Sequence, residues 1–159
     1  MKRLILVLLP ALFLSGCMLN GGGFIQGTGS GNGQLGFAYA DCDPDVTTTC
    51  FGPNRFQGFY LDPRASGFSL PRGVRMRFTS VGIQDPGGPS CIVAHPTYVS
   101  QNRNYPNLGG SQVAFVNACD VSEPNRGSDT LRVLVLSGPY AGYDSGTQPV
   151  IGGNLSFRP

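Results

Sequence analysis

Clusters of glycine, proline, asparagine and aspartate cut this chain into short apolar runs, and this pattern constrains the fold more than any other feature. The runs are rich in branched and aromatic residues and have the lengths of β-strands. No segment after the N-terminal region has the periodicity of an amphipathic helix. The sequence therefore predicts an all-β fold, either a single β-sandwich or a barrel. The predicted strands are 35–40, 55–61, 73–83, 91–95, 112–118, 130–137 and 150–157.

Two of these runs also indicate which faces of their strands are buried. Apolar and polar residues alternate over Val74–Thr79, which predicts a strand with one face in the core and one in water. Leu131–Leu136 is apolar on nearly both faces and predicts a central strand.

The first sixteen residues have the composition of an export signal. Lys2 and Arg3 precede an apolar run over 4–14, and the small residues Ser15 and Gly16 end it. This three-part order is typical of a secretory signal peptide. The apolar run is shorter than the roughly 20 residues that a membrane-spanning helix needs. We therefore expect export and cleavage.

The end of this segment, Leu14-Ser15-Gly16-Cys17, resembles the lipobox of bacterial lipoproteins. The resemblance implies a diacylglyceryl thioether on Cys17, cleavage after Gly16 and acylation of the new amino group. Several acyl chains on one residue anchor a protein stably at a membrane, whereas one chain does not. Met18 stands where an aspartate would resemble the inner-membrane retention signal of enterobacteria. We therefore expect a protein of the cell envelope, in the outer membrane if the organism has one.

A glycine-rich segment separates the lipobox from the first predicted strand. Seven glycines lie between positions 21 and 33, a composition typical of a flexible linker. Their spacing does not fit the G-x-G-x-x-G pattern of a dinucleotide-binding loop. The sequence thus predicts a signal peptide over 1–16, a lipidated cysteine with a flexible tether over 17–34, and a β domain over 35–159.

The cysteines that remain after lipidation are even in number, as expected for an exported domain. Cys42, Cys50, Cys91 and Cys119 allow three disulfide pairings, and we favour Cys42–Cys50 with Cys91–Cys119 because each pair brackets a loop or neighbouring strands. A zinc site is less favoured, since zinc sites usually show closely spaced cysteine pairs.

Charge restricts the class of partner. The chain has 11 basic and 9 acidic residues, and removal of Lys2 and Arg3 leaves nine of each. A nearly neutral domain lacks the concentrated positive charge of nucleic-acid-binding proteins. We expect a membrane partner through the lipid on Cys17, an envelope protein or glycan as a further partner, and no cofactor.

Alternating aspartates at Asp41, Asp43 and Asp45 resemble the start of a calcium loop. The 12-residue calcium loop needs glycine at its sixth position and glutamate at its twelfth, where this chain has Val46 and Gly52. An acidic loop beside a disulfide is therefore favoured over a calcium site.

The single histidine, His95, is the residue on which a hydrolase site would depend. Ser90 or Ser100 with Asp120 could complete a triad if the fold brought them to His95. The chain has no Gly-x-Ser-x-Gly nucleophile elbow. We favour a structural histidine and no catalytic residue.

Two other groups of residues are candidates for binding. Arg72, Arg75 and Arg77 could hold carboxylate or phosphate groups of lipids or acidic glycans, although a solvated strand face is the favoured interpretation. The loop tyrosines could form a binding platform, but packing at the bases of loops is favoured. These tyrosines are Tyr98, Tyr105, Tyr140 and Tyr143.

The mature part also resembles a family of small secreted bacterial β domains without a settled function. The resemblance lies in Gly31–Phe37, in Gly58–Asp62, in Asp120 with Gly127 and Ser128-Asp129, in Tyr143 and Gly146, and in Gly152–Leu155. It implies an all-β fold and transfers no catalytic residue. The sequence as a whole favours a lipid-anchored structural or binding module, with an envelope hydrolase or a calcium-stabilised adhesion domain as alternatives.

Overall fold

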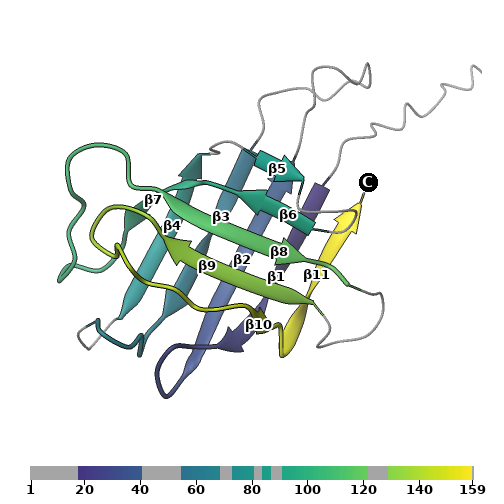
Figure 1. Ribbon diagram of the computed structural model, residues 1–159, viewed down its shortest axis with the longest axis horizontal. Helices are drawn as coiled ribbons and strands as arrows, with labels where there is room; N and C mark the ends of the chain where they lie inside the picture. Colours follow the sequence, from purple (N-terminus) through teal and green to yellow (C-terminus); the bar gives the residue numbers. More distant parts are fainter. Residues whose placement is uncertain are drawn as a thin grey trace, which may run out of the picture.

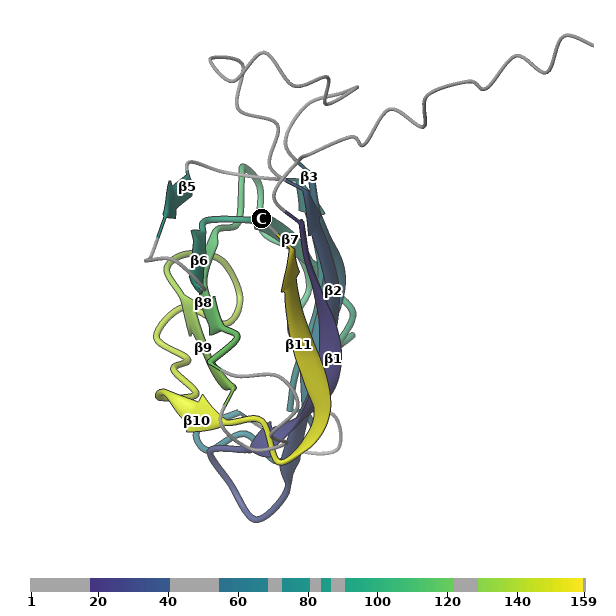
Figure 2. The ribbon, with the colours of Figure 1, turned by 90° about the vertical axis from the view of Figure 1, so that its right-hand side faces the viewer.

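The fold is a sandwich of two antiparallel β-sheets that face each other across one core (Figures 1 and 2). It is seen in a computed structural model that describes residues 18–40, 55–68, 73–80, 84–86, 91–121 and 129–158. The described residues contain strands and no helix. The prediction of an all-β domain is therefore confirmed, and of the two predicted architectures it is the β-sandwich.

The larger sheet has six strands and the smaller one five. The larger sheet runs in the order β11 (Gly152–Arg158), β1 (Met18–Gln26), β2 (Asn32–Ala40), β3 (Arg55–Asp62), β4 (Val74–Ser80) and β7 (Thr97–Ser100). The smaller sheet runs in the order β10 (Gln148–Pro149), β9 (Thr130–Val135), β8 (Ala114–Cys119), β6 (Cys91–Ala94) and β5 (Gln84–Pro86).

The core lies between the two sheets and is built by alternation along the strands. On β8 and β9 every second side chain is buried, because successive residues of a strand point to opposite faces. On β4 the buried residues are Val74, Met76 and Phe78, as the alternation predicts. Burying side chains of this size contributes about 1.5–3 kcal/mol each.

The glycine-rich segment is not a tether over most of its length, which corrects the prediction for 17–34. Met18–Gln26 forms β1, which pairs with β11 on one side and β2 on the other. A Cβ on Gly21 would lie 2.6 Å from the Leu155 side chain, and one on Gly23 would collide with the Gly152 carbonyl oxygen. These glycines therefore serve the close approach of β11 and not chain flexibility.

The strand predictions agree with the structure for the main strands and miss the short ones. Strand β4 ends at Ser80, and 81–83 of that prediction lie outside the described residues. The strands β5, β7 and β10 were not predicted. They are two to four residues long and start or end close to prolines, so their strand signal is weak.

One predicted disulfide is confirmed. Cys91 and Cys119 lie directly opposite each other on β6 and β8 and are bonded. The other favoured pair, Cys42 and Cys50, lies outside the described residues.

Candidate functional site

The residues proposed for a hydrolase site do not come together where the structure describes them. The His95 ring contacts the Phe115 ring edge-on, 5.4 Å between centroids. Asp120 follows the end of β8, five residues after Phe115. At about 3.3 Å per residue it therefore lies about 16 Å from Phe115 along the strand direction. The Ser100 hydroxyl lies 2.7 Å from the Tyr140 hydroxyl instead. Ser90 lies outside the described residues.

The proposed lipid-bearing cysteine and the three aspartates of the disfavoured calcium site lie in parts of the chain that are not described. They are Cys17, Asp41, Asp43 and Asp45. Among the described residues, no group of three histidine, cysteine, aspartate or glutamate side chains is arranged to hold a metal ion. Within the same residues, no helix has the length and apolar character needed to cross a membrane.

Three of the four loop tyrosines are core residues, as the favoured interpretation predicted. Tyr98, Tyr140 and Tyr143 are buried, and Tyr105 packs against the core. Tyr98 donates a hydrogen bond to the Ser137 carbonyl (2.8 Å), and its ring stacks on that of Tyr140. They are therefore not an exposed binding platform.

A buried carboxylate, Asp62, joins three parts of the fold. Its Oδ2 accepts hydrogen bonds from the Thr28 amide (2.9 Å), the Thr28 hydroxyl (3.1 Å) and the Tyr143 hydroxyl (2.9 Å). The Tyr60 hydroxyl lies 2.6 Å from that of Tyr143. Asp62 has no exposed surface, and its carboxylate oxygens accept several hydrogen bonds, so its role in the described fold is structural.

Asp129 plays a similar part at the edge of the larger sheet. Its Oδ2 accepts the Leu155 amide of β11 (2.8 Å). Asp62 and Asp129 thus each connect separate segments of the sandwich through hydrogen bonds.

The buried tyrosines should make the protein sensitive to alkali. Burial raises the pKa of Tyr98 to about 12 and also raises the pKa values of Tyr60, Tyr140 and Tyr143. The unfolded chain ionises its tyrosines near pH 10. In the folded state these tyrosines stay protonated up to a higher pH than in the unfolded state. Their contribution to the free energy of unfolding is therefore fully present below about pH 10 and is lost as the pH rises toward 12.

We expect the urea midpoint of unfolding to drop over this range, with tyrosinate absorbance appearing together with the loss of β-sheet circular dichroism. Ionisation of these tyrosines at their ordinary pKa in a protein that keeps its circular dichroism would contradict the burial described above.

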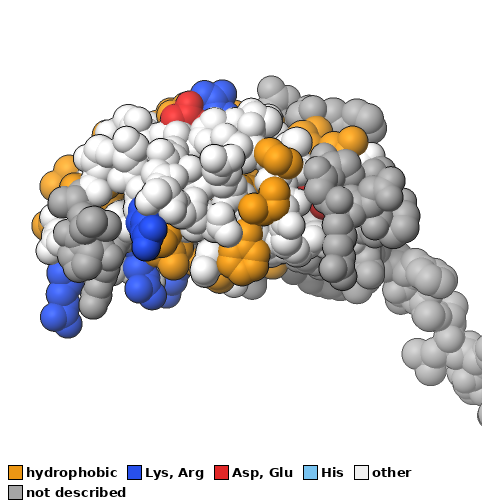
Figure 3. Space-filling view, turned by 90° about the horizontal axis from the view of Figure 1, so that it is seen from below, with side chains coloured by type: hydrophobic (Ala, Val, Ile, Leu, Met, Phe, Trp, Pro, Cys, Tyr) orange, Lys and Arg blue, Asp and Glu red, His pale blue; other side chains and the backbone are white. Residues whose placement is uncertain are grey.

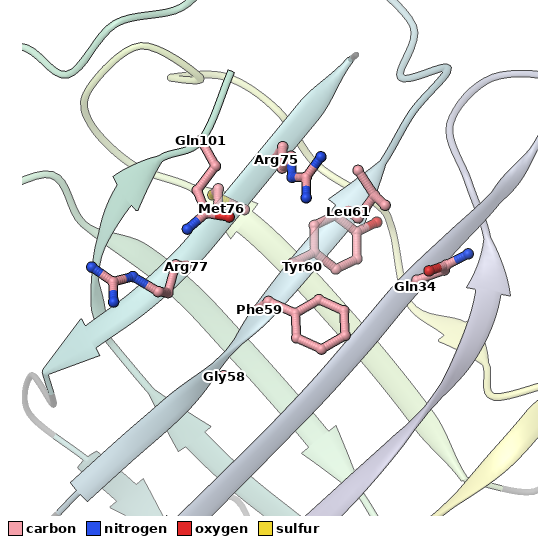
Figure 4. A pocket seen from close by; sticks show the side chains of 9 residues that line it. All are labelled: Gln34, Gly58, Phe59, Tyr60, Leu61, Arg75, Met76, Arg77 and Gln101. Atoms are coloured by element: carbon pink, nitrogen blue, oxygen red, sulfur yellow. The ribbon is translucent and has the colours of Figure 1, made fainter. Parts of the chain in front are cut away.

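The described surface has a groove that could hold a ligand, on the outer face of the six-stranded sheet (Figure 4). Its volume is about 460 Å³. We call it the outer-face groove. Its outward side chains are Gln34, Phe59, Leu61, Arg75, Arg77 and Gln101.

Strand register places these side chains in two rows across the sheet. In one row Gln34 of β2, Leu61 of β3 and Arg75 of β4 are opposite one another. In the next row Gly36, Phe59 and Arg77 are opposite one another. The groove is therefore built on strands, apart from Gln101 directly after β7, and the strand pairing fixes the spacing of its groups.

Arg75 and Arg77 are exposed and carry no counter-charge in the groove. Neither guanidinium has a hydrogen-bond or ion-pair partner among the described residues, and the groove lining contains no acidic residue. Asp62 is the one acidic residue in the described strands of this sheet, and it faces the core. In Figure 3 basic side chains gather on the lower flank of the molecule, with no acidic side chain visible beside them.

The opposite sheet shows the contrasting arrangement. There Arg132 and Asp144 form a two-pronged ion pair with N–O distances of 3.0 and 2.7 Å. Arg132 holds the pKa of the Asp144 carboxyl below its usual range. The arginines of the outer-face groove are thus available for a ligand in a way that Arg132 is not.

Phe59 supplies an apolar surface within the groove. Its side chain is 47% exposed although it is large and aromatic. The ring lies toward β2 over Gly36, where a Cβ would come 2.8 Å from it. Glycine at position 36 therefore leaves the space in which the ring lies flat against the sheet.

Sequence reasoning found part of this site and missed the rest. It selected Arg75 and Arg77 as a candidate, and the structure puts both in the groove, whereas Arg72 lies outside the described residues. It missed Phe59, Gln34 and Gln101. The alternation in β3 could have indicated an outward Phe59, but only the strand register shows that it stands beside Arg77.

Comparison with known proteins identifies no relative of this chain. No protein-family description, no curated protein and no solved structure matches the chain.

Proposed function

We propose that this chain is a lipid-anchored protein of the bacterial cell envelope that acts as a non-enzymatic binding module. The observation that carries the proposal is the lipobox-like Leu14-Ser15-Gly16-Cys17 at the end of a signal-type segment. The described part of the chain begins at Met18, in β1, on the C-terminal side of the proposed cleavage site. Processing at Cys17 would thus leave the described strands whole.

The shape and chemistry of the domain support a binding role. The outer-face groove combines two arginines that have no counter-charge among the described residues, an exposed aromatic ring and two amide side chains, while His95 does not line it. Concave surfaces with an apolar patch and a few placed polar groups are typical ligand sites. Met18 after the cysteine favours the outer membrane where the organism has one.

Intact mass and membrane fractionation of the wild type beside Cys17→Ala test the anchor. We expect a mass increase of lipid size and retention in the membrane fraction, and we expect both to be lost in the variant. Several acyl chains give stable membrane binding, so retention should survive a salt wash. An unmodified, freely soluble wild type would overturn the proposed anchoring and localisation together.

A further inference from the structure

We propose that the outer-face groove binds an anionic oligosaccharide, whose carboxylate or phosphate groups pair with Arg75 and Arg77 while a sugar ring packs on Phe59. This inference deepens the proposed function and rests on it, since it names the ligand of the envelope binding module.

The positive charge of the groove favours an anionic ligand. Two guanidinium groups stand on one strand face with no acidic side chain in the lining. Guanidinium forks match carboxylate and phosphate groups in two-pronged hydrogen bonds. Alternate residues of a strand are about 6.6 Å apart, so the two arginines form two separate positions for negative charge.

The directions of the two side chains favour a ligand with more than one anionic group. Figure 4 shows the Arg75 guanidinium directed over β3 toward Leu61, while the Arg77 guanidinium is directed the other way. A single small anion would contact one of them. A chain of repeating acidic units could contact both, with its backbone between them.

The ring of Phe59 and the amides at the two ends suit sugar units. The chain has no tryptophan, so Phe59 is the aromatic surface that the groove offers to the apolar face of a sugar ring. Gln34 on β2 and Gln101 after β7 lie three strand spacings apart, about 14 Å. Their amides can both donate and accept hydrogen bonds, as sugar hydroxyls require.

A lipid bilayer fits the same face less well. Surfaces that lie in a membrane interface have a continuous apolar stripe that enters the boundary between head groups and acyl chains. On this face the exposed rings of Phe24 and Phe59 are separated by Gln34 and Gly36. The face is therefore mainly polar, and its concave shape fits a narrow chain better than a flat surface.

Calorimetric titration of the full-length chain in non-ionic detergent tests the proposal. The probes are a trigalacturonate, a phosphorylated maltotriose, neutral maltotriose and inorganic phosphate. The variants are Arg75→Gln/Arg77→Gln, Phe59→Ser and the charge-matched control Arg64→Gln/Arg103→Gln, whose arginines lie outside the groove lining.

We expect binding of at least one of the two anionic trisaccharides. The groove double variant should weaken it by about tenfold or more, as the loss of charge-assisted hydrogen bonds implies. Phe59→Ser should weaken it several-fold, and the control should stay within about twofold. Whichever trisaccharide binds identifies the anionic group as carboxylate or phosphate.

Several results would overturn the proposal. They are binding of neither anionic trisaccharide, equal binding of neutral maltotriose, equal binding of inorganic phosphate, or an equal loss in the control variant. Sedimentation of Cys17→Ala with phosphatidylglycerol vesicles, abolished by Arg75→Gln/Arg77→Gln, would assign the face to a membrane instead. Because the titrations do not depend on lipidation, failure of the glycan proposal and failure of the anchor are separate results.

Discussion

Replacing Asp62 with alanine should lower the free energy of unfolding by about 3 kcal/mol. The substitution removes the oxygen that accepts the Thr28 amide, the Thr28 hydroxyl and the Tyr143 hydroxyl. A buried donor left without an acceptor costs about 1–3 kcal/mol. The loss also separates the β1–β2 turn from the end of β3, so the effect should appear as cooperative destabilisation in urea unfolding.

Two variants serve as controls for Asp62→Ala. Asp62→Asn keeps an acceptor oxygen but presents its NH2 group to the Arg64 amide, so we expect a loss of about 1 kcal/mol. Asp144→Ala breaks a half-exposed ion pair and should cost less than about 1 kcal/mol. Equal stability of Asp62→Ala and wild type would show that the network is not formed in solution.

Removing the disulfide with Cys91→Ala/Cys119→Ala should cost about 3.5 kcal/mol. The two residues are separated by 28 positions, and a bridge over a loop of this length restricts the unfolded chain by roughly that amount in the chain-entropy treatment. Two substitutions are preferable to a reductant, because a reductant would also act on any bond between Cys42 and Cys50.

A second cross-strand pair provides the matched control for the disulfide. The hydroxyls of Thr79 and Thr97 lie 3.1 Å apart across β4 and β7, and Thr79→Ala/Thr97→Ala should cost about 0.5 kcal/mol. A difference of several kcal/mol between the two double variants in urea unfolding is the expected result. Similar values would mean that the bridge adds little beyond an ordinary cross-strand contact.

The sequence was sufficient for the parts of the fold that depend on local pattern. The alternation around Arg75 and Arg77 predicted an exposed face on β4, and the pairing of Cys91 with Cys119 followed from their position in neighbouring strands. Both predictions rest on information within a few residues of each feature. The longer predicted strands, in which the alternation of side chains can be recognised, are present in the structure for the same reason.

The features that the sequence did not predict depend on contacts between distant segments. The glycine content of 21–33 predicts a tether and hides the strand signal of β1, because the approach of Gly152 to Gly23 is visible only in the folded chain. Asp62 precedes a proline, and nothing in the neighbouring sequence shows that Thr28 and Tyr143 surround it. The groove could be predicted only if the register of β2, β3 and β4 were known together.

Because the segment after Cys17 is the strand β1 and not a flexible linker, the distance between the proposed binding site and the membrane is restricted. A flexible linker of 18 residues would have an r.m.s. end-to-end distance of roughly 23 Å, so the domain could move by about that distance relative to the proposed lipid. Here the strand starts one residue after Cys17, and Gly22, in the same row as Phe59, is four residues from Met18, about 13 Å along the strand. With the proposed lipid on Cys17, the groove would lie at a nearly fixed height, so the ligand that we propose would have to enter a thin layer above the membrane.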